Sequence, residues 1–237
     1  VSKDKALSFL DHHLRCGNSL LSVHPHELHQ APAPHRVPEG QLAIDVAPQL
    51  ADALSTIIQE TARIEEQAST DLEIVKDKEE RWRRVRANLD PFLQVSDVWL
   101  AALDGTPVQP EEYRLLALYL VSPDRLAAAE KRRARTAFKA LKPHLDSTRH
   151  NLNPFHWHLE FPEVFFNDDG TPKENPGFDV VIGNPPYVRQ ESLGDSKDFF
   201  KEHFKSYHGM ADLYVYFFER GLDILKKDGL FGFISSN

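Results

Sequence analysis

The sequence predicts an α/β fold in which a parallel sheet is interrupted by a large all-helical insertion. Residues 178–234 follow the order strand, loop, helix, strand, which implies a crossover between parallel strands. Residues 45–142 show helical periodicity throughout and contain no catalytic motif. We therefore divide the chain into two parts of one core at 1–23 and 143–237, a linker at 24–44, and the insertion at 45–142.

Composition and charge restrict the class of protein. Of the 237 residues, 41% are hydrophobic and 27% are charged, which is enough apolar material for a packed core. The formal net charge of -8 excludes a uniformly basic surface, so any contact with nucleic acid is expected to be local. A single cysteine, Cys16, excludes an intramolecular disulfide and a cysteine-built zinc site, and cytoplasmic localisation is expected.

Neither a membrane span nor an export signal is expected. The sequence has no run of about 18 apolar residues and no basic-then-apolar start. It begins without Met and ends within an expected strand, so we interpret it as an internal piece of a longer protein.

The N-terminal part is predicted to form a short strand and a loop, followed by a linker. Residues 14–16 are the expected strand, and the turn-prone residues 17–19 follow it. Residues 24–38 contain several prolines, which exclude a regular helix or a central strand. We expect an extended linker here; its prolines are Pro25, Pro32, Pro34 and Pro38.

The insertion is expected to consist of consecutive amphipathic helices. Apolar residues recur at helical spacing across 50–75, which predicts one long helix. Asp90 before Pro91 is an N-cap signal, so that a helix ends near Leu89 and another begins. Two later prolines, each next to acidic residues, predict further helix starts because negative charge is favoured in a first helical turn; they are Pro110 and Pro123.

After Pro143 the pattern becomes aromatic and extended. Strict alternation predicts a strand, and a β-branched run that stops at Gly183 predicts a buried parallel strand. The expected elements are, in chain order, a strand at 155–161, a turn at 168–172, a strand at 178–182, helices at 196–207 and 211–227, a stop at Gly229, and a strand at 230–234.

The candidate catalytic residues are Asn184, Pro185, Pro186 and Tyr187, directly after the predicted parallel strand. Ligands usually bind at the carboxyl ends of such strands. Two consecutive prolines stiffen the loop and leave its carbonyl oxygens free, and Asn184 adds a side-chain oxygen. These acceptors could hold the two hydrogens of an exocyclic NH₂ group. Tyr187 offers a face for a flat base, an interaction of roughly 1–3 kcal/mol.

This motif resembles the catalytic motif of S-adenosylmethionine-dependent amino-methyltransferases, together with its flanks at 178–183 and Val188. Residues 211–217 and 225–234 resemble the helix and strand that follow it, and residues 14–20 resemble the loop that meets the cofactor's adenine. The greatest similarity is to the large adenine methylases of restriction-modification and phage-defence systems, including Type IIG and PglX-like proteins. These methylases also contain sequence segments similar to residues 155–162. The resemblance implies a class I, Rossmann-like sheet.

The resemblance further implies methyl transfer from S-adenosylmethionine to N6 of an adenine flipped out of duplex DNA. Asn184 and the Pro185 carbonyl would accept hydrogen bonds from the amine, and Tyr187 would stack on the base. Asn18 would contact the cofactor's adenine, with Gly17 keeping the loop close. The glycine-rich cofactor loop is absent from the sequence, so the fragment is expected to bind S-adenosylmethionine weakly and to be inactive alone. Other subunits or domains of a restriction-modification system are possible partners.

Alternative functions remain open at this stage. A methyltransferase acting on a protein glutamine or an RNA base would use the same loop chemistry, and the helical insertion could serve as a non-catalytic, partner-binding module. The motif taken alone could also be an ordinary turn.

Two further groups of residues could be functional, but a structural role is favoured for each. His156, His158 and Glu160 share one face of the predicted strand and could be metal ligands; we assign no metal site. The basic clusters at 81–86 and 131–135 could touch DNA phosphates, but their acidic neighbours favour a solvated face.

Overall fold

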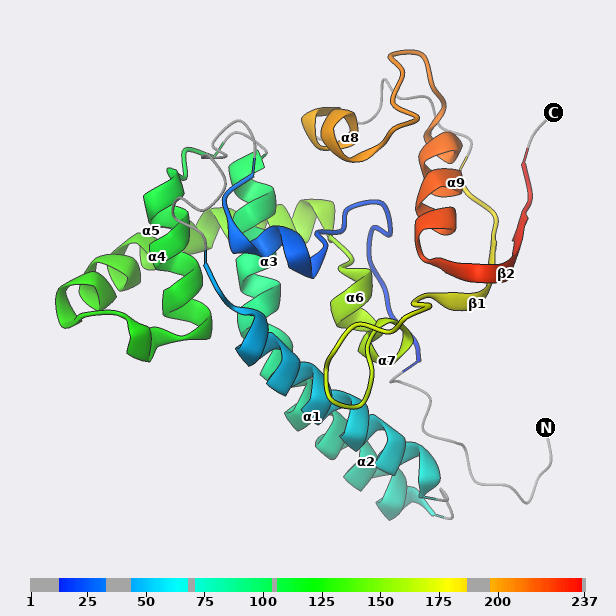
Figure 1. Ribbon diagram of the computed structural model, residues 1–237, viewed down its shortest axis with the longest axis horizontal. Coiled ribbons are helices and arrows are strands. Elements are labelled where there is room, and N and C mark those ends of the chain that lie inside the picture. Colours follow the sequence, from blue (N-terminus) through cyan, green and yellow to red (C-terminus); the bar gives the residue numbers. More distant parts are fainter. Residues whose placement is uncertain (1–12, 33–43, 68–70, 104–105, 187–196, 236–237) are drawn as a thin grey trace.

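The computed structural model describes residues 13–32, 44–67, 71–103, 106–186 and 197–235. Figure 1 shows α3, α4 and α5 on one side of the molecule and a small sheet with α9 on the other, while α6 and α7 lie between them. Together with the parallel strand pair described below, this arrangement agrees with the predicted α/β class.

The predicted long helix over 50–75 is two helices, α1 (Ala47–Glu66) and α2 (Leu72–Arg86). The Asp71 side chain accepts hydrogen bonds from the backbone N–H groups of Glu73 and Ile74, so it caps a new helix at this point. The apolar spacing continues across the break because α1 and α2 pack against each other through Ile57 and Trp82. Both helices project from the other helices in Figure 1.

Two of the three helix starts marked by proline are confirmed, those at Pro91 and Pro110. The helix α3 (Asp90–Leu103) follows a short 3-10 segment, η2 (Ala87–Leu89), and α4 (Pro110–Val121) begins at its proline. The next proline begins only a 3-10 turn, η3 (Pro123–Arg125), after which α5 (Ala128–Leu152) starts. All but three residues of α3 are buried, so it is the central helix of the helical body.

The prediction that the chain becomes extended after Pro143 is wrong, because α5 continues through this proline to Leu152. Ala134 and Leu145 are buried on either side of Pro143, and this packing keeps the helix continuous despite one missing backbone donor. The helix ends at Asn153, whose φ of 44° places it in the left-handed region.

The predicted strand at 155–161 is also wrong: two short helices, α6 (Trp157–Glu160) and α7 (Pro162–Phe165), occupy this region. The aromatic residues surround Phe178 from several sides, with ring centroids 5.6 to 5.9 Å from Trp157, Phe161 and Phe165. Alternating aromatic residues therefore reflect a shared aromatic cluster and not the two faces of a strand.

Two predictions for the N-terminal part need correction. Residues 14–16 form no strand, and the nearest pairing is an isolated bridge between Asn18 and Pro154. The expected linker contains a 3-10 helix, η1 (Pro25–His29), in which Leu28 is completely buried. It is fixed to the helical body because Trp99 donates to the Gln30 carbonyl at 3.2 Å and Tyr113 donates to the Leu28 carbonyl at 2.9 Å. Residues 33–43 lie outside the described residues.

Parallel pairing of β1 (Phe178–Gly183) and β2 (Leu225–Phe233) is confirmed. The helices α8 (Lys197–His203) and α9 (Leu213–Asp223) lie between them in sequence. Strand β2 begins five residues earlier than predicted (Leu225 against Leu230). The Asn175 side chain fixes this early part, since it exchanges hydrogen bonds with the backbone of Lys227.

The expectation that both faces of the strand are buried is wrong for the described residues. Val180, Ile182 and Leu230 are 52%, 78% and 69% exposed and lie on one face of the β1–β2 pair. The opposite face packs against α9, so only one side of the sheet is covered here.

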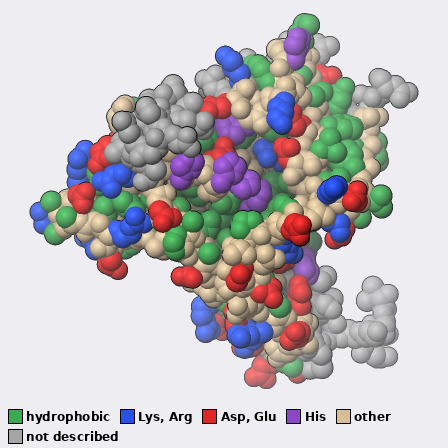
Figure 2. Space-filling view, viewed as in Figure 1, with side chains coloured by type: hydrophobic (Ala, Val, Ile, Leu, Met, Phe, Trp, Pro, Cys, Tyr) green, Lys and Arg blue, Asp and Glu red, His purple; other side chains and the backbone are tan. Residues whose placement is uncertain are grey.

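The buried residues form two clusters. One joins α3, α4 and α5 with the N-terminal segment, α8 and Tyr216; the other joins α1, α2, α7 and Ile224. On the face in Figure 2, Lys and Arg side chains are mixed with Asp and Glu over α1 and α2. Within the described ranges, no helix combines the length and the apolar character required to cross a membrane.

Candidate active site at the end of the first strand

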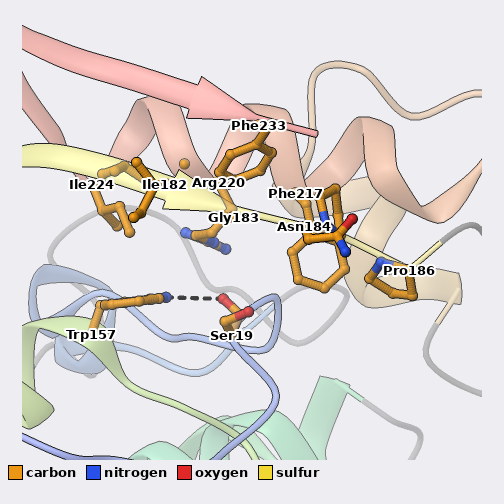
Figure 3. A pocket seen from close by; sticks show the side chains of 13 residues that line it. Ser19, Trp157, Ile182, Gly183, Asn184, Pro186, Phe217, Arg220, Ile224 and Phe233 are labelled. Carbon is orange, nitrogen blue, oxygen red and sulfur yellow. Dashed lines mark hydrogen bonds between the residues drawn. The ribbon is translucent and has the colours of Figure 1, made fainter. Parts of the chain in front are cut away.

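A cavity of about 240 Å³ lies where β1 ends, against α9 and the loop around Ser19 (Figure 3). Its walls come from five separate parts of the chain. They are Ser19; Trp157; Val181, Ile182, Gly183, Asn184, Pro185 and Pro186; Phe217, Arg220, Gly221 and Ile224; and Phe233. The structure therefore brings three of the four predicted catalytic residues to one cavity.

The rim of the cavity is the loop that leaves β1. The last residue of β1 is still hydrogen-bonded to the neighbouring chain segment, because the Ile234 N–H donates to the Gly183 carbonyl at 3.0 Å. Asn184 and Pro186 are exposed and Pro185 is buried. The two prolines carry no N–H, so the loop presents carbonyl and amide oxygens without competing backbone donors from these positions. Tyr187, the fourth predicted residue, lies outside the described residues.

Close approach of α9 to the sheet forms the opposite wall. A Cβ atom added at Gly221 would lie 2.6 Å from Cε2 of Phe231 and 3.2 Å from Cζ of Phe233. Glycine at this position lets the helix axis come near the strands, which directs Phe217 and Arg220 toward the cavity. A mainly apolar wall therefore faces the oxygen-rich rim.

The N-terminal loop forms the third side. The Trp157 indole N–H donates to the Ser19 carbonyl at 2.9 Å, the contact drawn in Figure 3. Asn18 is occupied within the loop, because its Oδ1 accepts from Leu20 N–H at 3.2 Å and its own N–H donates to the Asn153 carbonyl at 2.6 Å. Ser19 borders the cavity; Asn18 does not.

Gly17 packs behind the loop and not along the cavity. A Cβ atom at this position would meet Cδ2 of Phe155 at 2.8 Å and the Asn153 carbonyl oxygen at 3.1 Å. The glycine therefore permits close packing of the loop on the segment before α6. The cofactor contacts predicted for Gly17 and Asn18 stay predictions.

Arg220 is the one basic side chain among the cavity-lining residues. Its Nη2 donates to the Leu20 carbonyl at 3.2 Å, and its Cζ lies 5.1 Å from the centre of the Phe204 ring. The buried Nε has no hydrogen-bond partner among the described residues. Burial lowers the pKa of Arg220 from its ordinary value, because the charged form loses hydration.

The histidines singled out as possible metal ligands are separated in the structure. His156 accepts from the Val23 N–H at 3.1 Å, whereas the His158 ring lies 3.9 Å from that of His24. Glu160 forms ion pairs with Arg15 and Arg86. Across the described part of the chain, no group of three or more His, Cys, Asp or Glu side chains is arranged to hold a metal ion.

Burial determines the charge state of two of these histidines. It lowers the pKa of His158 to about 3 and that of His24 to about 4, with smaller contributions from neighbouring positive groups. Both imidazoles are therefore neutral near pH 7, and His158 packs on Phe165 at a ring distance of 4.1 Å. Their role in this region is in packing.

The basic clusters are interspersed with acidic side chains, as the sequence suggests. Arg83 and Arg84 pair with glutamates one turn earlier on α2, and Lys131 lies 3.5 Å from Asp124. Such pairs favour a solvated helix face over a continuous phosphate-binding surface.

Ten of the thirteen lining residues were not among the predicted site residues, and three of these ten bring polar groups to the cavity: Ser19, Trp157 and Arg220. Ser19 and Trp157 lie within segments 14–20 and 155–162, whose sequences resemble those of the methylases. This resemblance was a signal that could have identified both residues. Arg220 carries no such signal, because a single arginine in an amphipathic helix is normally solvent-facing.

Parts of the chain are similar in sequence to known restriction-modification methyltransferases. A 61-residue stretch is 46% identical to the Type II methyltransferase M.XhoI of Xanthomonas vasicola, covering 25% of this chain and 11% of that protein. An 84-residue stretch is 38% identical to the Type II methyltransferase M.BstVI of Geobacillus stearothermophilus, covering 34% and 14%. A 64-residue stretch is 39% identical to the Type II restriction enzyme and methyltransferase RM.Eco57I of Escherichia coli, covering 25% and 6%.

The matched stretches thus span between 6% and 14% of these relatives' own lengths. No solved structure gives a significant match. The family model described as Eco57I restriction-modification methylase matches residues 96–237, which is more than half of the chain and includes the whole cavity rim. The chain therefore belongs to the Eco57I restriction-modification methylase family.

Proposed function

We propose that this chain is the target-binding part of a DNA methyltransferase that transfers a methyl group from S-adenosylmethionine to adenine N6 in duplex DNA. The observation that carries the proposal is the rim formed by Asn184, Pro185 and Pro186 at the carboxyl end of a parallel strand, bordering a cavity. Ligands bind at this edge in open α/β sheets, and an acceptor-rich rim suits a substrate amine.

The chemistry follows from the acceptors. The Asn184 side-chain oxygen and the Pro185 carbonyl accept the two hydrogens of the adenine amine, which directs the nitrogen lone pair out of the base plane. S-adenosylmethionine supplies an electrophilic methyl group on its sulfonium. Tyr187 stacks on the flipped base and pays part of the cost of removing it from the duplex.

Several features fit a nucleoside-like cofactor with a charged tail. The cavity has apolar walls at Phe217 and Phe233, and a partly buried guanidinium borders it, whose buried Nε has no partner among the described residues. The loop at Ser19 supplies backbone and hydroxyl groups beside them. We expect Gly17 and Asn18 to support the cofactor's adenine from this loop.

We also propose that the β1–β2 pair is part of a larger, Rossmann-like sheet. The outer face is apolar at Val180, Ile182 and Leu230, and it is exposed in the described residues. Exposed apolar patches of this kind require a covering partner. Because the matched stretches span a small part of the relatives, we place the glycine-rich cofactor loop, DNA recognition and any nuclease in further domains or subunits of a cytoplasmic restriction-modification system.

Substrate choice tests the proposal against its alternatives. The complete protein should be incubated with labelled S-adenosylmethionine and, separately, with duplex DNA, tRNA and a release-factor protein. We expect label in DNA alone, recovered as N6-methyladenine after digestion. Label confined to a protein glutamine or to RNA would eliminate the proposed function.

A further inference from the structure

Arg220 lies at the cavity, and among the described residues its guanidinium makes one hydrogen bond while its buried Nε has no partner. A guanidinium has five N–H donors, and the hydrogen bond from Nη2 to the Leu20 carbonyl uses one of them. The Phe204 ring covers one face of the guanidinium, so water has little access from that side. Figure 3 shows the guanidinium on the side of β1 that faces Ser19 and Trp157.

No carboxylate of the described residues forms an ion pair with Arg220, although three contribute to its electrostatic environment. Glu219 accepts from the backbone N–H groups of Lys205 and Ser206 at 2.8 Å each. Glu27 accepts from the His24 N–H and lies 3.3 Å from the His203 ring nitrogen. Each of these glutamates is therefore committed to another partner.

The third carboxyl group, Asp223, does not form an ion pair with Arg220 within the described part of the chain either. Burial raises the pKa of Asp223 and the charge of Arg220 lowers it, so the two groups interact electrostatically without a direct contact. Two imidazoles, His24 and His158, are influenced by the charge of Arg220 and add no negative charge. A buried cation without a directly opposed anion is unfavourable, and a ligand anion would relieve this cost.

We propose that Arg220 binds an oxyanion of the ligand, a carboxylate or a phosphate, inside this cavity. The planar fork of N–H donors matches the two oxygens of such a group, and the apolar walls strengthen the interaction by excluding water. The inference rests on the proposed function, which offers two sources: the carboxylate of the methyl donor and a phosphate beside the flipped nucleotide. Arg220 would then be a ligand-binding residue contributed by α9.

The carboxylate source is tested by comparing two ligands that share the nucleoside. S-adenosylhomocysteine has the amino-acid carboxylate, and 5′-methylthioadenosine lacks it. Calorimetry on the complete protein should show that Arg220→Met lowers the affinity for S-adenosylhomocysteine at least tenfold. The affinity for 5′-methylthioadenosine should stay within twofold of the wild-type value. Arg220→Lys should show an intermediate loss, because it retains charge without the fork. Arg63→Met, which removes an exposed arginine paired with Glu60 on α1, is the matched control.

The phosphate source is tested on DNA whose site has been located from its methylated adenines. Duplexes with one methylphosphonate next to the target adenine remove a single negative charge. Wild-type binding should weaken at least fivefold at one position, and Arg220→Met should bind modified and unmodified duplexes equally. Loss of selectivity in either experiment supports the proposal and identifies the source.

The proposal is overturned if the wild-type protein prefers neither the carboxylate ligand nor the unmodified duplex, a result that needs no variant to fold. It is also overturned if folded Arg220→Met keeps both preferences. Failure of the proposed function looks different, because the wild-type protein would then transfer no methyl group to DNA. In that case the comparison of S-adenosylhomocysteine with 5′-methylthioadenosine would still show whether Arg220 binds a carboxylate.

Discussion

At the scale of single residues, two partly buried imidazoles link the fold to pH. The pKa values of His158 and His24 are lowered to about 3 and about 4, below the ordinary 6.5 that they regain on unfolding. The unfolded chain therefore takes up protons at a higher pH than the folded chain. Their contribution to stability is complete above about pH 6.5 and is lost as the pH falls from there toward 4.

We expect the urea midpoint of unfolding to decrease as the pH is lowered from 7 to 5. The midpoint of His158→Gln should depend less steeply on pH. Equilibrium unfolding at several pH values in this window measures both slopes. A wild-type midpoint that stays constant, or a variant slope equal to that of the wild type, would show that these imidazoles are not buried as described.

A second residue-scale prediction concerns the contact between α9 and the sheet. Gly221→Ala should destabilise the protein by about 1–3 kcal/mol, since its Cβ would lie 2.6 Å from the Phe231 ring. Gly209 is a matched control because a Cβ there meets no atom within 4 Å, so Gly209→Ala should change stability by less than about 0.5 kcal/mol. Thermal or urea unfolding compares them; equal effects would contradict the close packing.

The position of the loop after β1 could be predicted from sequence because the backbone chemistry there is local. Asn184, Pro185 and Pro186 could be placed at a cavity rim because prolines after a β-branched run fix both the strand end and the loop. Arg220 could not be found in this way. Its burial depends on Leu20 and Phe204, which are distant in sequence and meet it only in the folded chain.

At the scale of elements, helix starts could be predicted from the sequence. Whether an aromatic segment forms a helix or a strand could not. Pro91 and Pro110 marked true starts because a missing N–H costs nothing in a first turn. Residues 155–161 alternate as a strand would, yet they form a helical turn around Phe178. The aromatic cluster is a tertiary arrangement, so periodicity alone could not reveal it.

The break between α1 and α2 gives an element-scale prediction. Asp71→Ala should destabilise the α1–α2 hairpin by about 1 kcal/mol, because the side chain caps two backbone N–H groups of α2. Asp77→Ala, at an exposed position 3.9 Å from Arg81, should cost less than about 0.5 kcal/mol. Urea unfolding of both variants provides the comparison. Identical midpoints in the two would argue for one continuous helix.

At the scale of the whole molecule, the β1–β2 pair joins the helical body to the candidate site. The parallel order was predictable from the crossover pattern, but the exposure of its outer face was not. A β-branched run is typical of strands covered on both sides. Within the described residues one face is covered by α9 and the other face is exposed.

The central claim is that the rim after β1 holds the substrate amine. It is tested most directly by Asn184→Ala in the complete protein, with methyl transfer to DNA and calorimetric binding of S-adenosylhomocysteine measured side by side. Loss of one acceptor should lower the methylation rate at least 100-fold, as removal of a single catalytic hydrogen bond commonly does, on the order of 3 kcal/mol, while ligand affinity stays within about threefold. Undiminished methylation, or a loss of affinity that matches the loss of rate, would contradict the claim.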